Sequence, residues 1–285
     1  MNAAEGSDLP PNQSSNSIPM IYIVGNSYCG STLLGFLLGS NPDINFLGEF
    51  KIKTWLRERS CSCGQSIENC TFYGHYFEAF NEMKKNIFEE VRPRSVFTLL
   101  NKSDAIISKN SIEKLESFYK SINTEVLKLF PEAKYIVDSS KSIWLLNAWL
   151  HTSVKKDIKI IWLKRQLKPN LASFLKRGNK FIPALSSLLM NNLLIKKYLK
   201  RNRLEYLELN YDDFYEGYPG VSKSLSSFLK IEIPPEYINQ RNHHVISGNS
   251  FTRKAFTEQF KGFHKDEEWK TVLTPAQKKI VSWID

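Results

Sequence analysis

Two glycines five residues apart, Gly25 and Gly30, are the feature of this sequence that most clearly suggests chemistry. They follow a short apolar run at residues 21–24 and precede Ser31, Thr32 and a second apolar stretch. This order is typical of a strand, a tight turn and a helix whose first N–H groups hold a phosphate. The spacing is that of the phosphate-binding loop G-x-x-x-x-G-K-[ST], with Ser31 in the place of the lysine.

The absent lysine narrows the choice of ligand. In nucleoside triphosphatases this lysine serves the β- and γ-phosphates, beside a magnesium ion. A loop without it still offers N–H groups to a 5′-phosphate, so we expect a nucleotide with a less charged transferable group. A P-loop kinase or nucleoside triphosphatase is the alternative, with Asp138 as the acid that binds magnesium.

Composition and charge limit the partners. The chain has 285 residues, 42% of them hydrophobic, and a net charge of +10, which suits a large core and a multiply charged nucleotide. The lysines are scattered and no nucleic-acid motif is present, so we expect no specific nucleic-acid binding. No apolar segment approaches the ~20 residues of a membrane-spanning helix, and Glu5 and Asp8 do not fit a secretory signal. We expect a cytoplasmic protein without a membrane anchor.

Short apolar runs alternate with helical patterns from residue 18 onward. We expect strands at residues 20–24, 45–47, 134–137, 159–163 and 205–209. We expect helices at residues 31–38, 112–129, 143–150, 169–177, 184–199 and 221–229. This alternation predicts an α/β fold, a P-loop-like and mainly parallel sheet of four to five strands flanked by helices.

The domain organisation follows from the same pattern. Residues 1–17 are polar and lack periodicity, so we expect a flexible tail. We expect residues 18–285 to form a single domain. Residues 50–110 interrupt the alternation of strands and helices, and we expect them to form an inserted helical cap. Polar or charged residues follow nearly every expected strand, at the edge where parallel sheets carry their chemistry: Gly48, Glu49, Asp138, Ser139, Ser140, Lys141, Lys164, Arg165, Tyr211 and Asp212.

Three of the four cysteines, Cys61, Cys63 and Cys70, form the pattern C-x-C-x6-C. These three cysteines and His75 could bind zinc, but the C-x-C spacing is shorter than the C-x2-4-C spacing that is usual for zinc ligands. The spacing favours free thiols, or an occasional disulfide that holds a surface loop in place. We therefore expect no metal.

Four separated segments together resemble the sulfotransferases that use 3′-phosphoadenosine 5′-phosphosulfate (PAPS) and release 3′-phosphoadenosine 5′-phosphate (PAP), in particular bacterial members related to the tyrosylprotein and carbohydrate enzymes. Residues 25–34 are similar to the family's G-x-x-R-S-G-[ST]-T-L-L. Asn41-Pro42 with residues 48–51 is similar to N-P…G-E-x-[RK]. The other two segments resemble R-x7-S-x3-R and H-x3-G-N…R, at Arg165, Ser173, Arg177, His244, Gly248, Asn249 and Arg253.

The resemblance implies a set of cofactor-binding residues. The 5′-phosphosulfate loop would contribute Ser27, Tyr28, Cys29, Gly30, Ser31 and Thr32. The 3′-phosphate would be held by Arg165, Ser173 and Arg177, and the last segment would close over the nucleotide with Gly248, Asn249 and Arg253. Tyr211 is either an adenosine or phosphate contact or a buried core tyrosine.

The resemblance and the position after a strand both make Glu49 the expected base for the acceptor, unless it only pairs with a nearby lysine or arginine. His151 and His244 are competing candidates. The loop departs from the family at Tyr28, where a basic residue is usual, and at Cys29, where serine is usual. Either Lys51 or Lys141 supplies the missing charge, or turnover is compromised and the protein is a non-catalytic nucleotide-binding module.

The expected reaction is transfer of the sulfuryl group of PAPS to a hydroxyl or amine of a small-molecule acceptor. We expect in-line transfer, with catalysis by positioning and electrostatics and without a metal. A sugar, a lipid headgroup or a polar natural product would suit the mixed aromatic and polar composition.

Overall fold

The computed structural model describes residues 17–50, 60–74, 87, 90–91, 107–234, 244–249, 252–253 and 265–284. The expected tail, apart from Ser17, and most of the expected helical cap lie outside these residues. Lys51 and His75 also lie outside them. Residues 60–74 of the cap form a series of turns with one antiparallel bridge, between Ser60 and Ser66.

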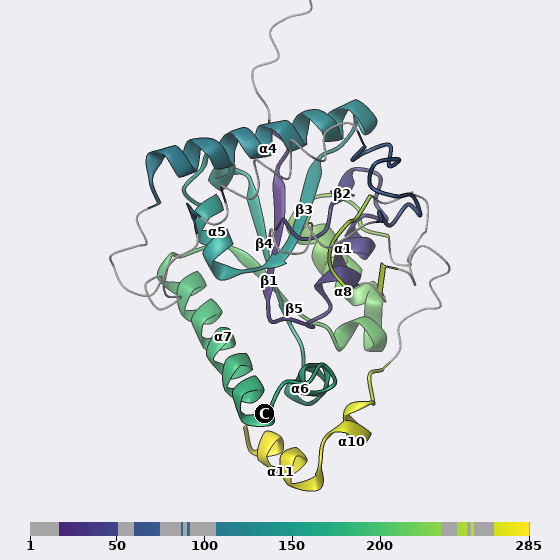
Figure 1. The fold of residues 1–285 in the computed structure, drawn as a ribbon, viewed down its shortest axis with the longest axis vertical. Helices are drawn as coiled ribbons and strands as arrows, with labels where there is room; N and C mark the ends of the chain where they lie inside the picture. Colours follow the sequence, from purple (N-terminus) through teal and green to yellow (C-terminus); the bar gives the residue numbers. More distant parts are fainter. Residues whose placement is uncertain are drawn as a thin grey trace, which may run out of the picture.

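The described residues form a sheet of five parallel strands at the centre of the molecule (Figure 1). In spatial order the strands are β2 (Ile44–Phe46), β3 (Tyr135–Lys141), β1 (Met20–Gly25), β4 (Ile158–Lys164) and β5 (Tyr206–Asn210). The expected α/β class and parallel sheet are therefore confirmed.

Side chains of β1 alternate between two apolar cores. Met20, Tyr22 and Val24 belong to one core, and Ile21 and Ile23 belong to the other. Every residue of β1 is buried, because alternate side chains of a strand point to opposite faces and both faces of this sheet are covered. A continuous apolar run in the sequence is the mark of such a strand.

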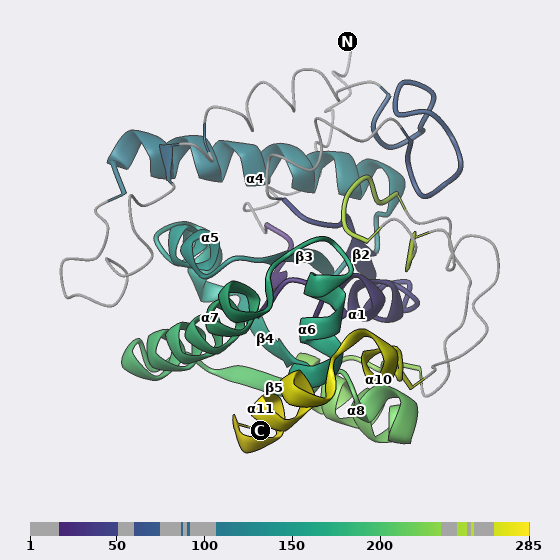
Figure 2. The ribbon, with the colours of Figure 1, turned by 60° about the horizontal axis from the view of Figure 1, so that its bottom comes forward.

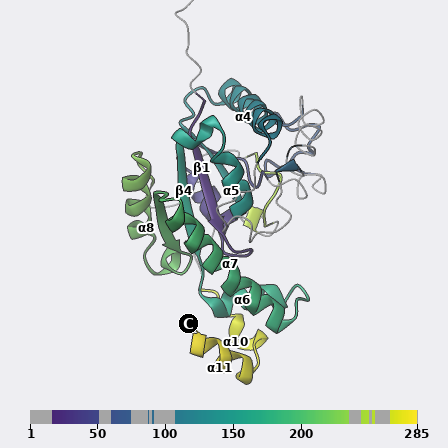
Figure 3. The ribbon, with the colours of Figure 1, turned by 90° about the vertical axis from the view of Figure 1, so that its left-hand side faces the viewer.

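Helices cover both faces of the sheet, as Figure 3 shows with the sheet seen from its edge. One core holds side chains of α4 (Lys109–Leu129), α5 (Ile143–Trp149) and α7 (Phe181–Arg201). The other holds side chains of α1 (Ser31–Leu38) and α8 (Asp213–Leu229). A short 3-10 helix, Ser153–Lys156, leads into β4.

A smaller group of helices lies beyond the carboxyl ends of β1 and β4 (Figures 1 and 2). It consists of α6 (Leu167–Leu175), α10 (Trp269–Val272) and α11 (Pro275–Ile284). These helices and α7 share a third apolar cluster, which includes Leu171, Leu188, Leu273 and Val281. The carboxyl-terminal part of the chain is thereby attached near the edge where the site is expected.

The predicted elements differ from the observed ones mainly at their ends. β3 continues to Lys141, so Asp138 to Lys141 belong to the strand and do not follow it. α4 begins at Lys109, because the Ser108 hydroxyl caps it by accepting a hydrogen bond from the Ser111 N–H at 3.1 Å. α8 begins at Asp213 and continues past a non-helical Gly217 and Pro219, residues that in the sequence suggest a break. α10 and α11 were not predicted.

Among the helices that the structure describes, none combines the length and the apolar character that crossing a membrane requires.

Gly35 lets α1 lie directly against β2. A Cβ at Gly35 would lie 2.3 Å from ring carbons of Phe46, which is 2% exposed and packs edge-to-face on Phe36 with ring centroids 5.3 Å apart. We therefore expect Gly35→Ala to lower the free energy of unfolding by about 1–3 kcal/mol, because overpacking exceeds the gain in helix propensity. Urea unfolding measures this change.

The matched control is Gly220→Ala in α8, where a Cβ would meet no atom within 4 Å. This variant should be as stable as the parent protein or slightly more stable. A Gly35→Ala protein that unfolds no more easily than the parent would contradict the packing described for α1 and β2.

Candidate active site

The loop between β1 and α1 lies where the strand order reverses. From β1 the chain runs to β2 and back to β3 on one side, and then crosses to β4 on the other side of β1. Open α/β sheets bind ligands at such a point, beyond the carboxyl ends of the strands. The loop, the end of β3 and the residues after β4 meet here.

The loop has the backbone geometry of an anion cradle. Gly30 has a φ of +94°, and a Cβ there would lie 2.1 Å from a ring carbon of Tyr211, so only glycine fits. No side chain caps the first turn of α1, which begins after Gly30. The N–H groups of this turn are therefore suited to an anion.

Two asparagines of α7 hold the start of the loop. The Asn26 amide donates to Oδ1 of Asn192 at 2.8 Å, and the Asn191 amide donates to Oδ1 of Asn26 at 2.7 Å. Sequence reasoning missed both α7 residues. The available signal in the sequence was a pair of adjacent asparagines within a mainly apolar part of the helix.

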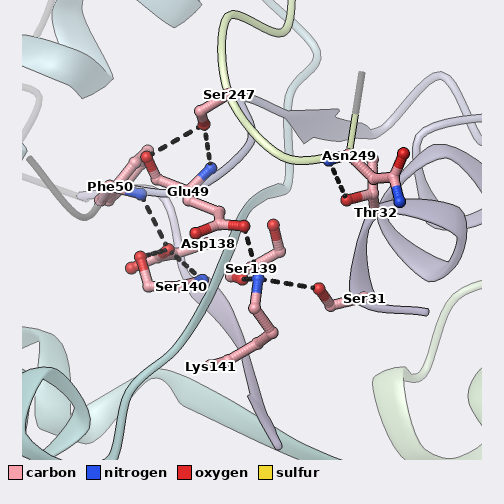
Figure 4. A network of polar contacts seen from close by, with 10 residues as sticks. All are labelled: Ser31, Thr32, Glu49, Phe50, Asp138, Ser139, Ser140, Lys141, Ser247 and Asn249. Atoms are coloured by element: carbon pink, nitrogen blue, oxygen red, sulfur yellow. Dashed lines mark hydrogen bonds and ion pairs between the residues drawn. The ribbon is translucent and has the colours of Figure 1, made fainter. Parts of the chain in front are cut away.

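The central contact of the site joins Lys141, Glu49 and Ser31 (Figure 4). The Lys141 ammonium lies 2.5 Å from Oε1 of Glu49 and 3.2 Å from the Ser31 hydroxyl, and it also donates to the Ser139 carbonyl. The Lys141 and Glu49 side chains are each 13% exposed. Lys141 has a φ of +64°, a strained conformation for a lysine that is often found at functional sites.

We give the name strap to residues 244–249, which cross both Glu49 and the loop (Figure 4). The Ser247 hydroxyl accepts from the Glu49 N–H at 2.6 Å, and the Asn249 N–H donates to the Thr32 hydroxyl at 3.0 Å. A Cβ on Gly248, at a φ of +102°, would lie 2.8 Å from that hydroxyl. The structure thus brings Gly248 and Asn249 to the loop, as the sequence suggested.

Asp138 has a different place from the one expected. It is completely buried, and its Oδ1 accepts hydrogen bonds from the Phe50 N–H at 3.1 Å and from the Ser140 N–H at 2.9 Å. Burial raises the pKa of Asp138 to about 6. Its bonds hold the segment after β2 against β3, whereas Lys141 reaches the loop.

Arg165 follows β4 and contacts the loop. Its guanidinium donates to the Tyr28 carbonyl at 2.6 Å, forms an ion pair with Asp266 and lies 4.6 Å from the Tyr211 ring centroid. Asp266 precedes α10 and was not anticipated. The Tyr211 ring lies against Gly30, and burial raises the pKa of Tyr211. Its role as an adenosine or phosphate contact stays a prediction.

Arg177 also reaches Tyr28, with its guanidinium 4.6 Å from the ring centroid. Tyr28 is therefore contacted by two arginines, by Arg165 at its carbonyl and by Arg177 at its ring. The Ser173 hydroxyl donates to the Pro169 carbonyl within α6. The structure therefore brings Arg165 and Arg177 to the loop at Tyr28, whereas the hydrogen bond of Ser173 stays within its own helix.

The remaining predicted residues are placed as follows. Ser27 is exposed, and Cys29 is buried under the loop, where burial raises its pKa. Arg253 is 8% exposed and donates to the Val245 carbonyl in the strap. Of the competing bases, His151 bonds to the Asn147 carbonyl of α5 and His244 contacts cysteine sulfurs. Lys51 lies outside the described residues.

The chain is similar in fold to solved structures of sulfotransferases. The sulfotransferase domain from the curacin biosynthetic pathway matches with a TM-score of 0.54 and 16% identity, over 95% of this chain and 98% of that domain. The fold is that of a sulfotransferase domain. The sulfotransferase domain from the Synechococcus PCC 7002 olefin synthase has a TM-score of 0.48 at 15% identity, over 98% of both chains. Sulfotransferase STF9 from Mycobacterium avium matches with a TM-score of 0.42 and 13% identity, over 95% of this chain and 76% of that chain. No protein-family model and no curated protein matches the chain.

The burial of Asp138 predicts a pH-dependent stability. Because its folded-state pKa of about 6 lies above that of an exposed aspartate, its contribution to stability is present at low pH and is lost as the pH rises through 6. Asp138→Asn keeps an acceptor oxygen and never ionises. We expect the variant to gain about 2 kcal/mol on the parent protein between pH 4 and pH 7, since one pKa unit corresponds to about 1.4 kcal/mol.

Urea unfolding at a series of pH values measures the difference between the two proteins. Glu113→Gln, at an exposed carboxylate of α4, gives the background. A constant difference between Asp138→Asn and the parent from pH 4 to pH 7 would show that Asp138 is ionised in the folded state at little cost.

Proposed function

We propose that this protein is a sulfotransferase that moves the sulfuryl group of PAPS to a hydroxyl or amine of a small-molecule acceptor. The observation that carries the proposal is the position of Lys141. Its ammonium lies 3.2 Å from the hydroxyl of Ser31, the residue that stands in the place of the loop lysine. The end of β3 thus supplies the positive charge that the loop itself lacks.

The two ends of the nucleotide would be held by different elements. The first turn of α1 and the hydroxyls of Ser31 and Thr32 suit the 5′-phosphosulfate. Arg165 and Arg177, which both contact Tyr28, suit the 3′-phosphate. Each charge-assisted contact contributes about 1.5–3 kcal/mol, so such a pair favours PAPS over an analogue without the 3′-phosphate.

In the proposed transfer, the acceptor oxygen or nitrogen attacks sulfur in line with the bond to the 5′-phosphate. That S–O bond breaks and its electron pair stays on the phosphate, so negative charge grows on the bridging oxygen. Lys141 is placed to stabilise this charge. The acceptor's proton passes to Glu49, and the transfer as proposed uses no metal.

The ion pair between Lys141 and Glu49 links the two roles proposed for these side chains, because the Lys141 ammonium lies 2.5 Å from Oε1 of Glu49. In the proposed reaction, Lys141 turns towards the donor's phosphate and the Glu49 carboxylate faces the acceptor.

The kinase alternative gains no support from the site. Its magnesium-binding acid would be Asp138, which is completely buried and bonded to Phe50 and Ser140. For the acceptor, we propose a small polar molecule of the natural-product class. One similar domain comes from the curacin biosynthetic pathway, which is in keeping with this class.

Arg165→Ala should weaken PAP binding by more than about tenfold, because one charge-assisted contact is lost. Arg165 also holds the loop at Tyr28, so we compare PAP with adenosine 5′-phosphate, which lacks the 3′-phosphate. The affinity for adenosine 5′-phosphate should change little. Isothermal titration calorimetry of both ligands, without magnesium, makes the measurement.

The matched variant is Asp266→Asn, which removes the carboxylate that pairs with Arg165. It should bind PAP at least as tightly as the parent protein. Equal losses for PAP and adenosine 5′-phosphate in Arg165→Ala would assign this arginine to loop structure and not to the 3′-phosphate.

Glu49→Gln should leave PAP affinity near that of the parent protein and lower single-turnover transfer from labelled PAPS by about 10²-fold or more, the usual contribution of a general base. The acceptor panel contains alcohols, phenols and amines. His151→Gln, at a competing candidate, should keep the parental rate. Full transfer by Glu49→Gln would move the base to a histidine, and a parent protein that binds PAP without any transfer would favour the binding module.

A further inference from the structure

Three cysteines that are close in the sequence and one distant histidine converge at the first residue of the strap. They are three thiols and one imidazole, from Cys61, Cys63, Cys70 and His244, and their ligand atoms all lie within 4.8 Å of one another. Nδ1 of His244 lies 3.2 Å from the Cys70 sulfur and 3.8 Å from the Cys61 sulfur. The Cys63 and Cys70 sulfurs are 3.9 Å apart. The mechanism proposed above uses none of these groups.

These separations match a tetrahedral zinc site. With Zn–S near 2.3 Å and Zn–N near 2.0–2.1 Å, tetrahedral geometry places two sulfurs about 3.8 Å apart, and a sulfur and a nitrogen about 3.5 Å apart. The three observed distances agree with these values within a few tenths of an ångström. A disulfide needs sulfurs at about 2.05 Å, and all four cysteines of the chain are free.

We propose that Cys61, Cys63, Cys70 and His244 bind one structural Zn²⁺ ion. Three thiolates and an imidazole are a donor set that zinc prefers, and four protein ligands close the coordination sphere. This assignment replaces His75, the fourth ligand considered from the sequence, with a residue 174 positions from Cys70.

The backbone explains how a C-x-C spacing can supply two ligands. The Cys61 N–H donates to the Gln65 carbonyl at 2.9 Å and the Gly64 N–H donates to the Cys61 carbonyl at 3.1 Å. Gly64 has a φ of +87°, which makes this turn tight. The turn brings both sulfurs to the same side, so the short spacing is no obstacle to zinc.

Neighbouring contacts fix the histidine. The Tyr73 hydroxyl donates to the His244 carbonyl at 3.1 Å, and the Phe72 ring stacks on the imidazole with centroids 5.8 Å apart. Ser62 pairs with Val245 through two hydrogen bonds, from the Ser62 N–H at 2.9 Å and to the Ser62 hydroxyl at 2.8 Å. Such surrounding contacts orient metal ligands before the ion binds.

The ion would position the strap. His244 is the first residue of the strap, whose Ser247 bonds to Glu49 and whose Asn249 bonds to Thr32. Zinc would therefore attach the segment that crosses the loop to residues 61–70 of the cap. This effect on the loop, unlike the metal site itself, rests on the proposed function.

The first test is the metal content of the purified full-length chain. Inductively coupled plasma mass spectrometry should find about one zinc per chain. Cys70→Ser and His244→Asn should each lower the content severalfold or more. Two matched controls, Cys29→Ser at the cysteine outside the cluster and His75→Asn at the alternative histidine, should keep about one zinc per chain.

The second test uses the parent protein and does not depend on whether the variants fold. Removal of the metal by a chelator should lower the melting temperature, and added Zn²⁺ should restore it. Replacement by Co²⁺ should give the visible absorption of tetrahedral thiolate coordination. Both readouts are independent of PAPS and of turnover, so failure of the zinc site and failure of the proposed reaction can be distinguished.

Four results would overturn the proposal. One is a parent protein that contains no zinc and shows no cobalt spectrum after reconstitution. Another is unchanged zinc in Cys70→Ser and His244→Asn. A third is loss of zinc in His75→Asn but not in His244→Asn, which would remove His244 from the ligand set. The fourth is a disulfide between Cys63 and Cys70 in freshly purified protein, seen by mass spectrometry, because oxidised cysteines are not thiolate ligands.

Discussion

The positive charge of Lys141 lies where little water reaches it, so protein groups have to balance it. The rest of the site depends on the contacts that these groups make with the ammonium. An ammonium at 13% exposure is costly unless an opposite charge and hydrogen bonds satisfy it. Glu49 provides the charge, and Ser31 and the Ser139 carbonyl provide the acceptors. One cation thus joins the end of β3, the segment after β2 and the loop after β1. The left-handed backbone of Lys141 is tolerated because these contacts determine it.

The sheet could be predicted from the sequence because its inner strands are covered on both faces. Apolar runs, most of them continuous, marked the five strands to within one or two residues at most ends. The exception is β3, where the run ends at Val137 although the strand continues to Lys141. Inside the core the Ser140 N–H donates to Oδ1 of Asp138, and no hydrophobic pattern can reveal such buried polar residues. α10 and α11 were missed because their packing on α6 shows only in three dimensions.

The candidate site was predictable where a motif kept its local spacing. The loop, Glu49, Lys141, Arg165 and the strap all lie together, as the order of motifs suggested. Partners from distant segments were not predictable. Asn192 reaches Asn26 from α7, Asp266 reaches Arg165 from the carboxyl-terminal part, and His244 joins cysteines more than 170 residues before it. Local spacing pointed to His75 because sequence distance was the only measure of proximity available.

The pairing of Arg165 with Asp266 gives the protein an internal competitor for anions. A guanidinium that is 8% exposed and already bonded to a carboxylate must exchange that partner before it can hold a phosphate. Part of the intrinsic affinity is then used to displace Asp266, and the apparent affinity falls by the fraction of molecules in which the arginine is accessible. In the proposed reaction, the donor and the product would both have to displace Asp266, so each would bind less tightly than it would to an arginine without that partner. Asp266 precedes α10, and the packing of α10 against α6 would keep the carboxylate near Arg165 after the nucleotide leaves.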